Sequence, residues 1–160
     1  MTLEEKKRLI DLLTESQSAN RAIVQGIDSE LQVYKDPDWR VRDILGHLAT
    51  WDRQVTRSLQ AYQSGTEYAI PDLDEDESDF NQQAVLEQRA LTTQQVLEEC
   101  DQAREDFKKS VEDIPLEKFP GDLLYPWGDE RGSIAKLVEY MVEHDAEHRD
   151  EIMSAIQASQ

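Results

Sequence analysis

Apolar residues recur at helical spacing along most of the chain, and the strict alternation of a half-buried strand is never sustained. The first run begins after a capping-box pattern at Thr2–Glu5, which predicts a helix over residues 3–33. Its inward positions are Leu9, Leu13, Ile23, Ile27 and Leu31. This spacing favours one long amphipathic helix at the start of the chain.

A second helix is expected to begin at Asp36-Pro37, where the aspartate can cap the helix and the proline fits its first position. Its apolar face continues until Gly65, which we expect to end it. The apolar positions are Val41, Ile44, Leu48, Trp51, Val55, Leu59 and Tyr62. Residues 71–80 then hold six carboxylates and no basic residue, which indicates a solvated loop.

A third helical stretch begins near Ser78 or Asp79, either of which can cap it, and its apolar stripe reaches Val111. A second capping-box pattern at Thr92–Gln95 predicts that this helix kinks or restarts there. The prolines and glycines between residues 115 and 132 indicate a long loop.

Ser133 can cap the last helix, whose stripe begins with Ile134, Leu137 and Met141. Four long helices with apolar stripes predict an all-α, up-down four-helix bundle with a long loop before the last helix. The chain shows no internal repeat and no shift of composition that would mark a boundary, so we expect a single domain over residues 1–160.

Acidic residues outnumber basic ones by 35 to 17, which gives a formal net charge of −18. Such a surface repels phosphate backbones and anionic lipids, so neither nucleic acid nor membrane is an expected partner. No apolar run approaches the length of a membrane span, and residues 1–8 lack the apolar core of a secretory signal. The only cysteine, Cys100, cannot form an intramolecular disulfide, and we expect a cytoplasmic protein.

The candidate chemistry lies in the histidines, two of which are four residues apart in the last helix. His144 and His148 therefore lie on one face of that helix, close enough to bind one metal ion. They continue its apolar stripe, so they occupy core positions, where imidazole nitrogens need partners. The remaining histidine, His47, lies on or beside the inward face of the second helix. All three can thus point into one bundle.

Three imidazoles are the ligand number of a catalytic rather than a structural zinc site, because a catalytic ion keeps a position for water or substrate. Imidazole binds several metals, so we expect a divalent ion, zinc or nickel first, with iron, copper or manganese as alternatives. Against a metal site, histidine pairs also occur on solvated helix faces, and a core histidine is commonly satisfied by a backbone or carboxylate oxygen.

Four further residues have two interpretations each. Asp43 and Glu147 either orient a ligand imidazole or are surface carboxylates. Gly46 either allows close helix packing or leaves room for a ligand. Trp127, in the loop before the last helix, either lines the mouth of a pocket or plugs the core.

Three stretches resemble the DinB-like (DNA-damage-inducible) superfamily, namely Trp39–Leu48, the Trp-Gly pair at 127–128 and His144–His148. The resemblance spans nearly the whole chain. It implies a four-helix bundle whose divalent metal is held by one histidine of the second helix and a pair in the last helix, here His47, His144 and His148. The family includes enzymes that use low-molecular-weight thiols such as mycothiol or bacillithiol, and its members are frequently homodimers. Asn81 also matches an asparagine common in the family.

Two classes of function fit these observations. The first is a metal-dependent enzyme, a thiol-dependent transferase or a hydrolase, that acts on a small molecule, with a low-molecular-weight thiol as a candidate partner. The second is a non-catalytic bundle that binds a small ligand or a partner, with a structural metal or none. A nucleic-acid mimic rests only on the net charge, and diffuse charge of this kind is more typical of solubility.

Overall fold

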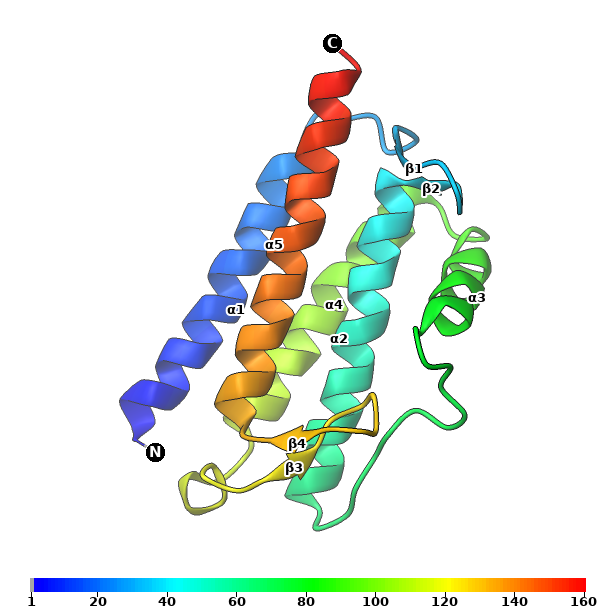
Figure 1. Cartoon of the computed structure of the whole chain (residues 1–160). Coiled ribbons are helices and arrows are strands. Elements are labelled where there is room, and N and C mark those ends of the chain that lie inside the picture. Colours follow the sequence, from blue (N-terminus) through cyan, green and yellow to red (C-terminus); the bar gives the residue numbers. More distant parts are fainter. Residues whose placement is uncertain (1) are drawn as a thin grey trace.

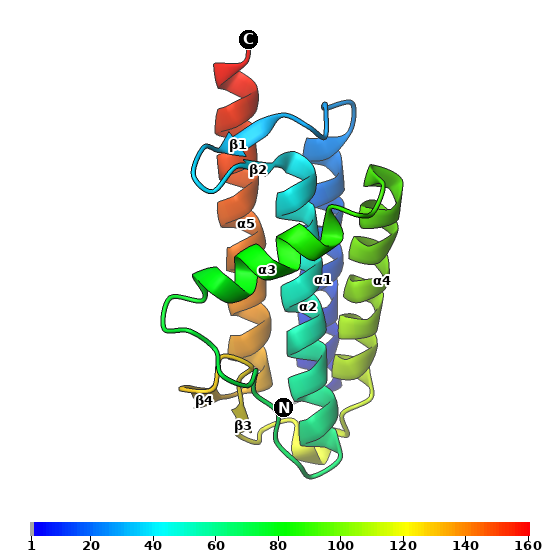
Figure 2. The same cartoon turned by 90° about the vertical axis from the view of Figure 1, so that its right-hand side faces the viewer.

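The computed structural model describes residues 2–160, and in this part of the chain four long helices pack side by side (Figure 1). These are α1 (Leu3–Val24), α2 (Val41–Gln63), α4 (Thr93–Glu112) and α5 (Ile134–Ala158). A shorter helix, α3 (Ser78–Gln88), crosses the outside of α2 (Figure 2). The predicted all-α four-helix bundle is confirmed.

Contacts between helices give their directions. Asp52 of α2 pairs with Arg104 of α4, and Gln63 near the end of α2 bonds to Asp113 just after α4, so these two helices run parallel. Ser16 of α1 bonds to Asp145 of α5, and Arg8 of α1 pairs with Glu139 of α5, so these two helices run parallel as well. The chain therefore departs from a plain up-down order after α2, where residues 64–77 and α3 carry it back along the bundle (Figure 2).

The first helix ends at Val24, so the predicted continuation to residue 33 is wrong. Gly26 adopts a positive φ of 75°, which a helix cannot contain, and the chain turns there. Residues that were expected on the helix, such as Ile27 and Leu31, instead pack against the core from a loop. Their burial explains why the apolar spacing continues beyond the helix.

The predicted helix start at Pro37 is also wrong, because residues 32–40 form a small hairpin. Its strands are β1 (Gln32–Tyr34) and β2 (Trp39–Arg40), paired antiparallel. Helix α2 begins after Arg40, whose backbone N–H donates to the Asp43 carboxylate.

The other helix starts follow the predicted capping chemistry with one exception. Thr2 and Thr92 both form complete capping boxes, and the Ser133 hydroxyl accepts from the Lys136 N–H, so the predicted restart at Thr92 is confirmed. Helix α3, by contrast, begins after Glu77 and is not capped by Ser78 or Asp79.

The acidic segment supplies the missing caps of α3. The Asp76 carboxylate accepts from the N–H of Ser78, and the Asp74 carboxylate accepts from the N–H groups of Asp79 and Phe80. Carboxylates are favourable at this end of a helix because the free N–H groups and the helix dipole attract negative charge. The segment is thus partly a capping structure and not only a solvated loop.

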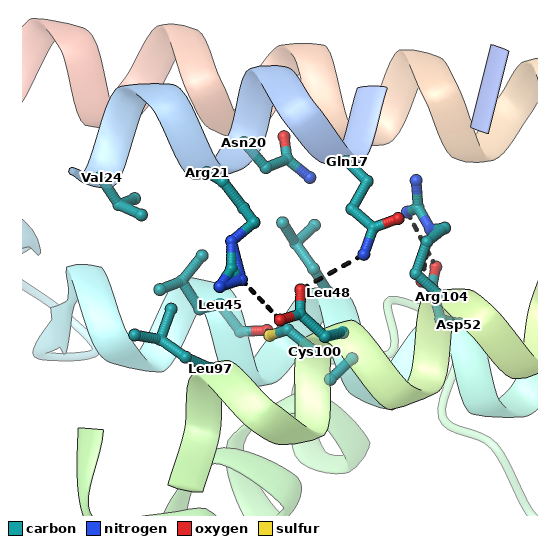
Figure 3. Close-up of a pocket in the computed structure, with 12 residues that line it drawn as sticks. Gln17, Asn20, Arg21, Val24, Leu45, Leu48, Asp52, Leu97, Cys100 and Arg104 are labelled. Atoms are coloured by element: carbon teal, nitrogen blue, oxygen red, sulfur yellow. Dashed lines mark hydrogen bonds and ion pairs between the residues drawn. The ribbon is translucent and has the colours of Figure 1, made fainter. Parts of the chain in front are cut away.

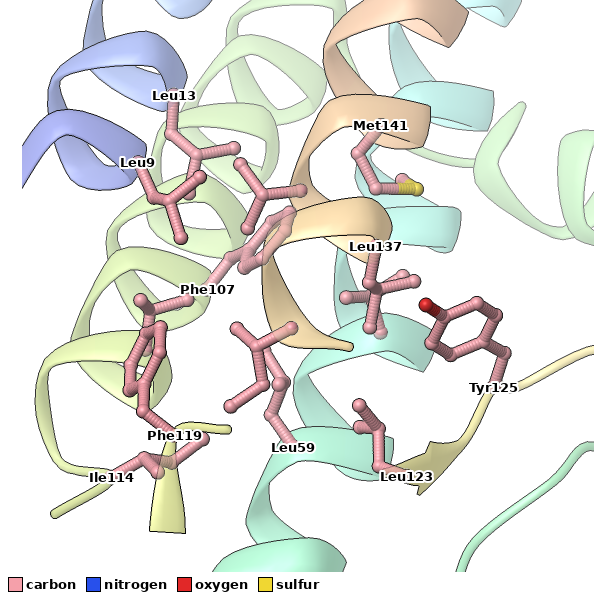
Figure 4. Packing of buried hydrophobic residues seen from close by; sticks show 14 of the residues in the cluster. Leu9, Leu13, Leu59, Phe107, Ile114, Phe119, Leu123, Tyr125, Leu137 and Met141 are labelled. Carbon is pink, nitrogen blue, oxygen red and sulfur yellow. The ribbon is translucent and has the colours of Figure 1, made fainter. Parts of the chain in front are cut away.

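One core cluster fills the end of the bundle near the start of α1 and α5 (Figure 4). The predicted loop before α5 contributes to it, because Phe119 and Tyr125 are fully buried between the helices. This loop contains the short helix η1 (Leu116–Lys118) and a hairpin of β3 (Leu123–Leu124) and β4 (Arg131–Gly132). The loop is therefore part of the core at the end of the bundle where α5 begins.

A second core cluster lies at the opposite end, under the β1–β2 hairpin. Its buried members are Trp39, Val41, Ile44, Leu45, Val85, Val96 and Ile152. Trp39 also packs on the ring of His47, with centroids 5.1 Å apart, so this cluster borders the histidines. Within residues 2–160, no helix has the length and apolar character needed to cross a membrane.

Candidate metal centre

The structure brings together the three histidines singled out in the sequence. Nε2 of His144 lies 3.1 Å from Nε2 of His47 and 3.1 Å from Nε2 of His148. One ligand atom from each residue lies within 4.8 Å of the others. His47 comes from α2 and the other two from α5, and the four-residue spacing of the pair stacks both rings on the face that meets α2.

Burial keeps these imidazoles neutral. It lowers the pKa of His144 to about 4 and that of His47 well below its ordinary value, and repulsion from neighbouring histidines adds to both shifts. Burial also lowers the pKa of His148, although Glu151 acts in the opposite direction. Neutral imidazole is the form that binds a metal ion, so the three side chains are in a form that could bind one at neutral pH.

The spacing of the nitrogens suits a metal ion. Two nitrogens bound tetrahedrally to zinc at about 2.0–2.1 Å lie roughly 3.3 Å apart, close to the 3.1 Å between the imidazole pairs. Hydrogen bonds alone fit less well, because Nε2 of His144 faces two nitrogens and can serve only one of them. The donor set therefore fits a divalent cation.

Two further residues contact Nδ1 of His148, the ring nitrogen opposite the one that faces His144. Its Nδ1 lies 2.8 Å from a carboxylate oxygen of Glu151 and 3.1 Å from the hydroxyl of Tyr34. A carboxylate on Nδ1 requires the proton to be there, which leaves the Nε2 lone pair free for a ligand. Neither residue is among the candidates predicted from the sequence. Glu151 could have been found from its position three residues after His148. Tyr34 lies between the two helices predicted there, in a hairpin that the apolar pattern does not reveal.

The carboxylates proposed from the sequence do not contact the histidines through any hydrogen bond in residues 2–160. Asp43 is buried, accepts from the Arg40 N–H and pairs with Arg89, so it caps α2 and is not a surface carboxylate. Glu147 is exposed, as its surface interpretation predicted. Neither residue orients an imidazole.

Gly46 serves close packing. A Cβ atom at this position would lie 1.9 Å from Oε1 of Gln88 on α3, so the missing side chain lets α3 cross α2 next to the histidines. Close to this crossing, Nε1 of Trp51 donates to Oδ1 of Asn81 at 2.8 Å. Asn81, which matched the family asparagine, thus fixes the Trp51 ring.

A cleft of about 310 Å³ opens beside the histidines. Its lining residues are His47, Trp51, Glu77, Asn81, Trp127, Tyr140, Met141 and His144. The volume is within the range of small-molecule sites. Trp127 therefore lines this cleft, as one of its two interpretations predicted, and it also packs against the first core cluster.

A second cavity, between α1, α2 and α4, has no comparable chemistry (Figure 3). Its volume of about 30 Å³ admits water but no substrate. The Cys100 thiol in its wall donates to the Leu45 carbonyl, and burial raises the pKa of this thiol to about 12. Cys100 is therefore a poor nucleophile at neutral pH.

Solved structures of other proteins share the fold. An uncharacterised protein from Clostridium difficile 630 has 14% identity and a TM-score of 0.78, with 98% of both chains covered. YfiT from Bacillus subtilis, described as a probable metal-dependent hydrolase with an unusual four-helix bundle topology, has 16% identity and a TM-score of 0.74, with 99% of this chain and 90% of that chain covered.

A mycothiol-dependent maleylpyruvate isomerase has 11% identity and a TM-score of 0.73. The similarity covers 95% of this chain but 61% of the isomerase, so the chain spans less than two thirds of that enzyme's length. At these identities the three likenesses establish the fold alone. No curated protein sequence matches the chain significantly.

The histidines lie within a segment that matches a family model. The model of the DinB superfamily covers residues 10–152, which include His47, His144 and His148. The family resemblance noted in the sequence is confirmed by this match, and the chain belongs to the DinB superfamily.

Proposed function

We propose that this protein is a metal-dependent enzyme that acts on a small molecule, with a divalent ion held by His47, His144 and His148. One observation carries the proposal: two of the three imidazoles, His47 and His144, also line the cleft. An ion held by these nitrogens would thus be accessible to a ligand. A structural zinc site normally has four protein ligands and no such access.

When bound, the ion supplies positive charge that lowers the pKa of a thiol or a water molecule and polarises a carbonyl group. The protein's own residues prepare the ligands and the cleft. Glu151 holds the proton of His148 on Nδ1, so the opposite nitrogen points toward the other two histidines. Trp51 and Met141 cover the bundle side of the cleft with apolar surface, which limits the water that reaches a bound molecule.

We further propose a thiol-dependent transfer or a hydrolysis as the reaction, with a low-molecular-weight thiol or water as the nucleophile. The shared fold with a mycothiol-dependent isomerase and with a probable metal-dependent hydrolase supports this choice. Zinc and nickel are the ions that we would test first, and imidazole ligands also accept copper and iron. The alternative is a non-catalytic bundle, in which a bound ion has no position for an exchangeable ligand.

The test begins with the metal content of the purified protein, measured by mass spectrometry. We expect one divalent ion per chain in the wild type, loss of the ion in His144→Ala, and retention in Glu147→Gln, a control at an exposed position of the same helix. Unchanged metal content in His144→Ala would refute the ligand assignment.

A second measurement separates an enzyme from a non-catalytic bundle. In the cobalt-substituted protein, an added thiol should change the visible absorption spectrum, because a catalytic site keeps a position for an exchangeable ligand. The same thiol should change the spectrum of cobalt-loaded Glu147→Gln to the same extent. A spectrum that no thiol or anion perturbs would support the structural role.

A further inference from the structure

The cleft beside the histidines combines aromatic side chains with one acidic side chain. Three of its lining residues are aromatic, Trp51, Trp127 and Tyr140, and one is acidic, Glu77. None of the described residues that line it is lysine or arginine. Apart from the histidines, which are neutral, the only formal charge in the lining is therefore negative.

The aromatic side chains are held in place by their polar atoms. Glu130 accepts from Nε1 of Trp127 at 3.0 Å and from the hydroxyl of Tyr140 at 2.9 Å, through different carboxylate oxygens. Trp51 is fixed in the same way by Asn81. The rings also pack on one another, with the centroids of Trp51 and Trp127 6.5 Å apart, so together they form an aromatic wall of the cleft, and aromatic surface attracts cations. Lys136 already uses this attraction at Tyr140, where its Nζ lies 5.3 Å from the ring centroid.

Glu77 has no counterion within residues 2–160. Its carboxylate forms no hydrogen bond or ion pair there, although the residue is partly buried and precedes α3 with a positive φ of 64°. The side chain does not cap the helix. Burial raises the pKa of Glu77, and Asp129, Asp74 and Asp76 raise it further. A partly buried carboxylate in such a negative surrounding gains from a cationic partner.

We propose that the cleft binds small organic amines, with the protonated nitrogen paired to Glu77 and the apolar skeleton packed on Trp51 and Trp127. This proposal rests on the proposed function, which puts the reacting end of the substrate at the histidines. It adds the chemical class of that substrate. Glu77 is then a specificity-determining residue. A ligand with a carboxylate at the same end would meet like charge and bind poorly.

The test uses three probes with the same phenyl ring and different charge: 2-phenylethylamine, 2-phenylethanol and phenylacetate. Binding is followed by tryptophan fluorescence in protein freed of metal with a chelator, so that phenylacetate cannot bind through an ion. We expect the amine to bind about tenfold more tightly than the alcohol, and phenylacetate to bind more weakly than the alcohol.

Two variants with the same change of charge locate the effect. Glu77→Gln should lose the preference for the amine, whereas Glu75→Gln, at an exposed position two residues earlier, should keep it. Circular dichroism checks that both variants are folded. Equal affinity of the wild type for the three probes, or the same loss of preference in both variants, would overturn the proposal.

The outcome is separable from that of the proposed function, because metal content is measured on the same preparations before the chelator is added. A preference for the amine in a protein that never bound metal would leave the amine site standing and refute the metal-dependent enzyme. Bound metal without a preference for the amine would refute the amine site and leave the proposed metal-dependent function standing.

Discussion

Nδ1 of His148 lies 2.8 Å from Oε1 of Glu151, one turn further along α5. This contact fixes the tautomer of the imidazole that completes the histidine trio, and it places negative charge behind the ring. Both effects strengthen a metal ligand, because the carboxylate raises the basicity of the opposite nitrogen. The hydroxyl of Tyr34, which belongs to strand β1, lies 3.1 Å from the same nitrogen.

Replacing Glu151 by Gln should therefore weaken metal binding while the ligands themselves stay in place. We expect the metal dissociation constant to rise about tenfold, at the lower end of the effect seen for outer partners of metal ligands. Competition with a chromophoric chelator measures the change. Asp150→Asn removes a charge from an exposed neighbouring position and should leave affinity unchanged. An equal effect of both substitutions would indicate that general charge, and not the contact with His148, controls affinity.

The sequence predicts the features of this fold that depend on local chemistry. The capping boxes at Thr2 and Thr92 are formed by side chains three residues apart, so their pattern is visible without any tertiary information. The convergence of His144 and His148 follows from helical spacing in the same way. The inward position of His47 also follows from the sequence, because an apolar stripe marks the inward face of its helix.

Other features depend on contacts that spacing does not reveal. Ile27 and Leu31 keep a helical interval yet pack from a loop, because Gly26 turns the chain before them. Tyr34 reaches His148 only through the hairpin that follows. Arg104 and Asp145 are fully buried partners, whereas charged residues in a sequence are normally placed on the surface.

The metal-free protein should lose stability between pH 7 and pH 5. A histidine whose pKa is lowered by folding binds fewer protons when folded than when unfolded, so its stabilising contribution is present above its unfolded pKa and is lost as the pH falls toward the folded value. For His144, with a folded pKa of about 4, the loss over this interval is about 2 kcal/mol. His47 acts in the same direction.

Asp52 opposes this trend, because burial raises its pKa to about 6 and acidification then favours the folded state by about 1 kcal/mol. Urea unfolding at the two pH values measures the net loss. His144→Gln should reduce the pH dependence, since it removes a contributing histidine. Equal stability of the wild type at pH 7 and pH 5 would contradict the assignment of neutral, buried imidazoles.

Substituting Gly46 by Ala should destabilise the protein because the new methyl group would lie 1.9 Å from Oε1 of Gln88. The Gln88 side chain is flexible and can move, but it would then lose the hydrogen bond from its Nε2 to the Thr50 hydroxyl. We expect a loss of about 1 kcal/mol in the free energy of unfolding.

The same substitution should have the opposite sign in a Gln88→Ala background. There the obstacle is gone, and alanine is favoured over glycine within a helix by roughly 0.5–1 kcal/mol. Chemical denaturation of the four proteins gives the coupling energy between the two positions. A loss of similar size in both backgrounds would mean that the cost arises from another neighbour.

Arg104 is the cation between two buried carboxylates, with its guanidinium 2.7 Å from Asp52 and 2.9 Å from Asp145. Arg104→Met should therefore lower the free energy of unfolding by about 3–5 kcal/mol, because it leaves both acids buried without their partner. Arg21→Met is the matched control, since the pair between Arg21 and Asp101 is roughly half exposed and should contribute at most about 1 kcal/mol. The deficit of Arg104→Met should shrink at pH 5, where the unpaired carboxylates can take up protons. A deficit equal to that of Arg21→Met, or one that does not change with pH, would show that the buried charges do not depend on Arg104.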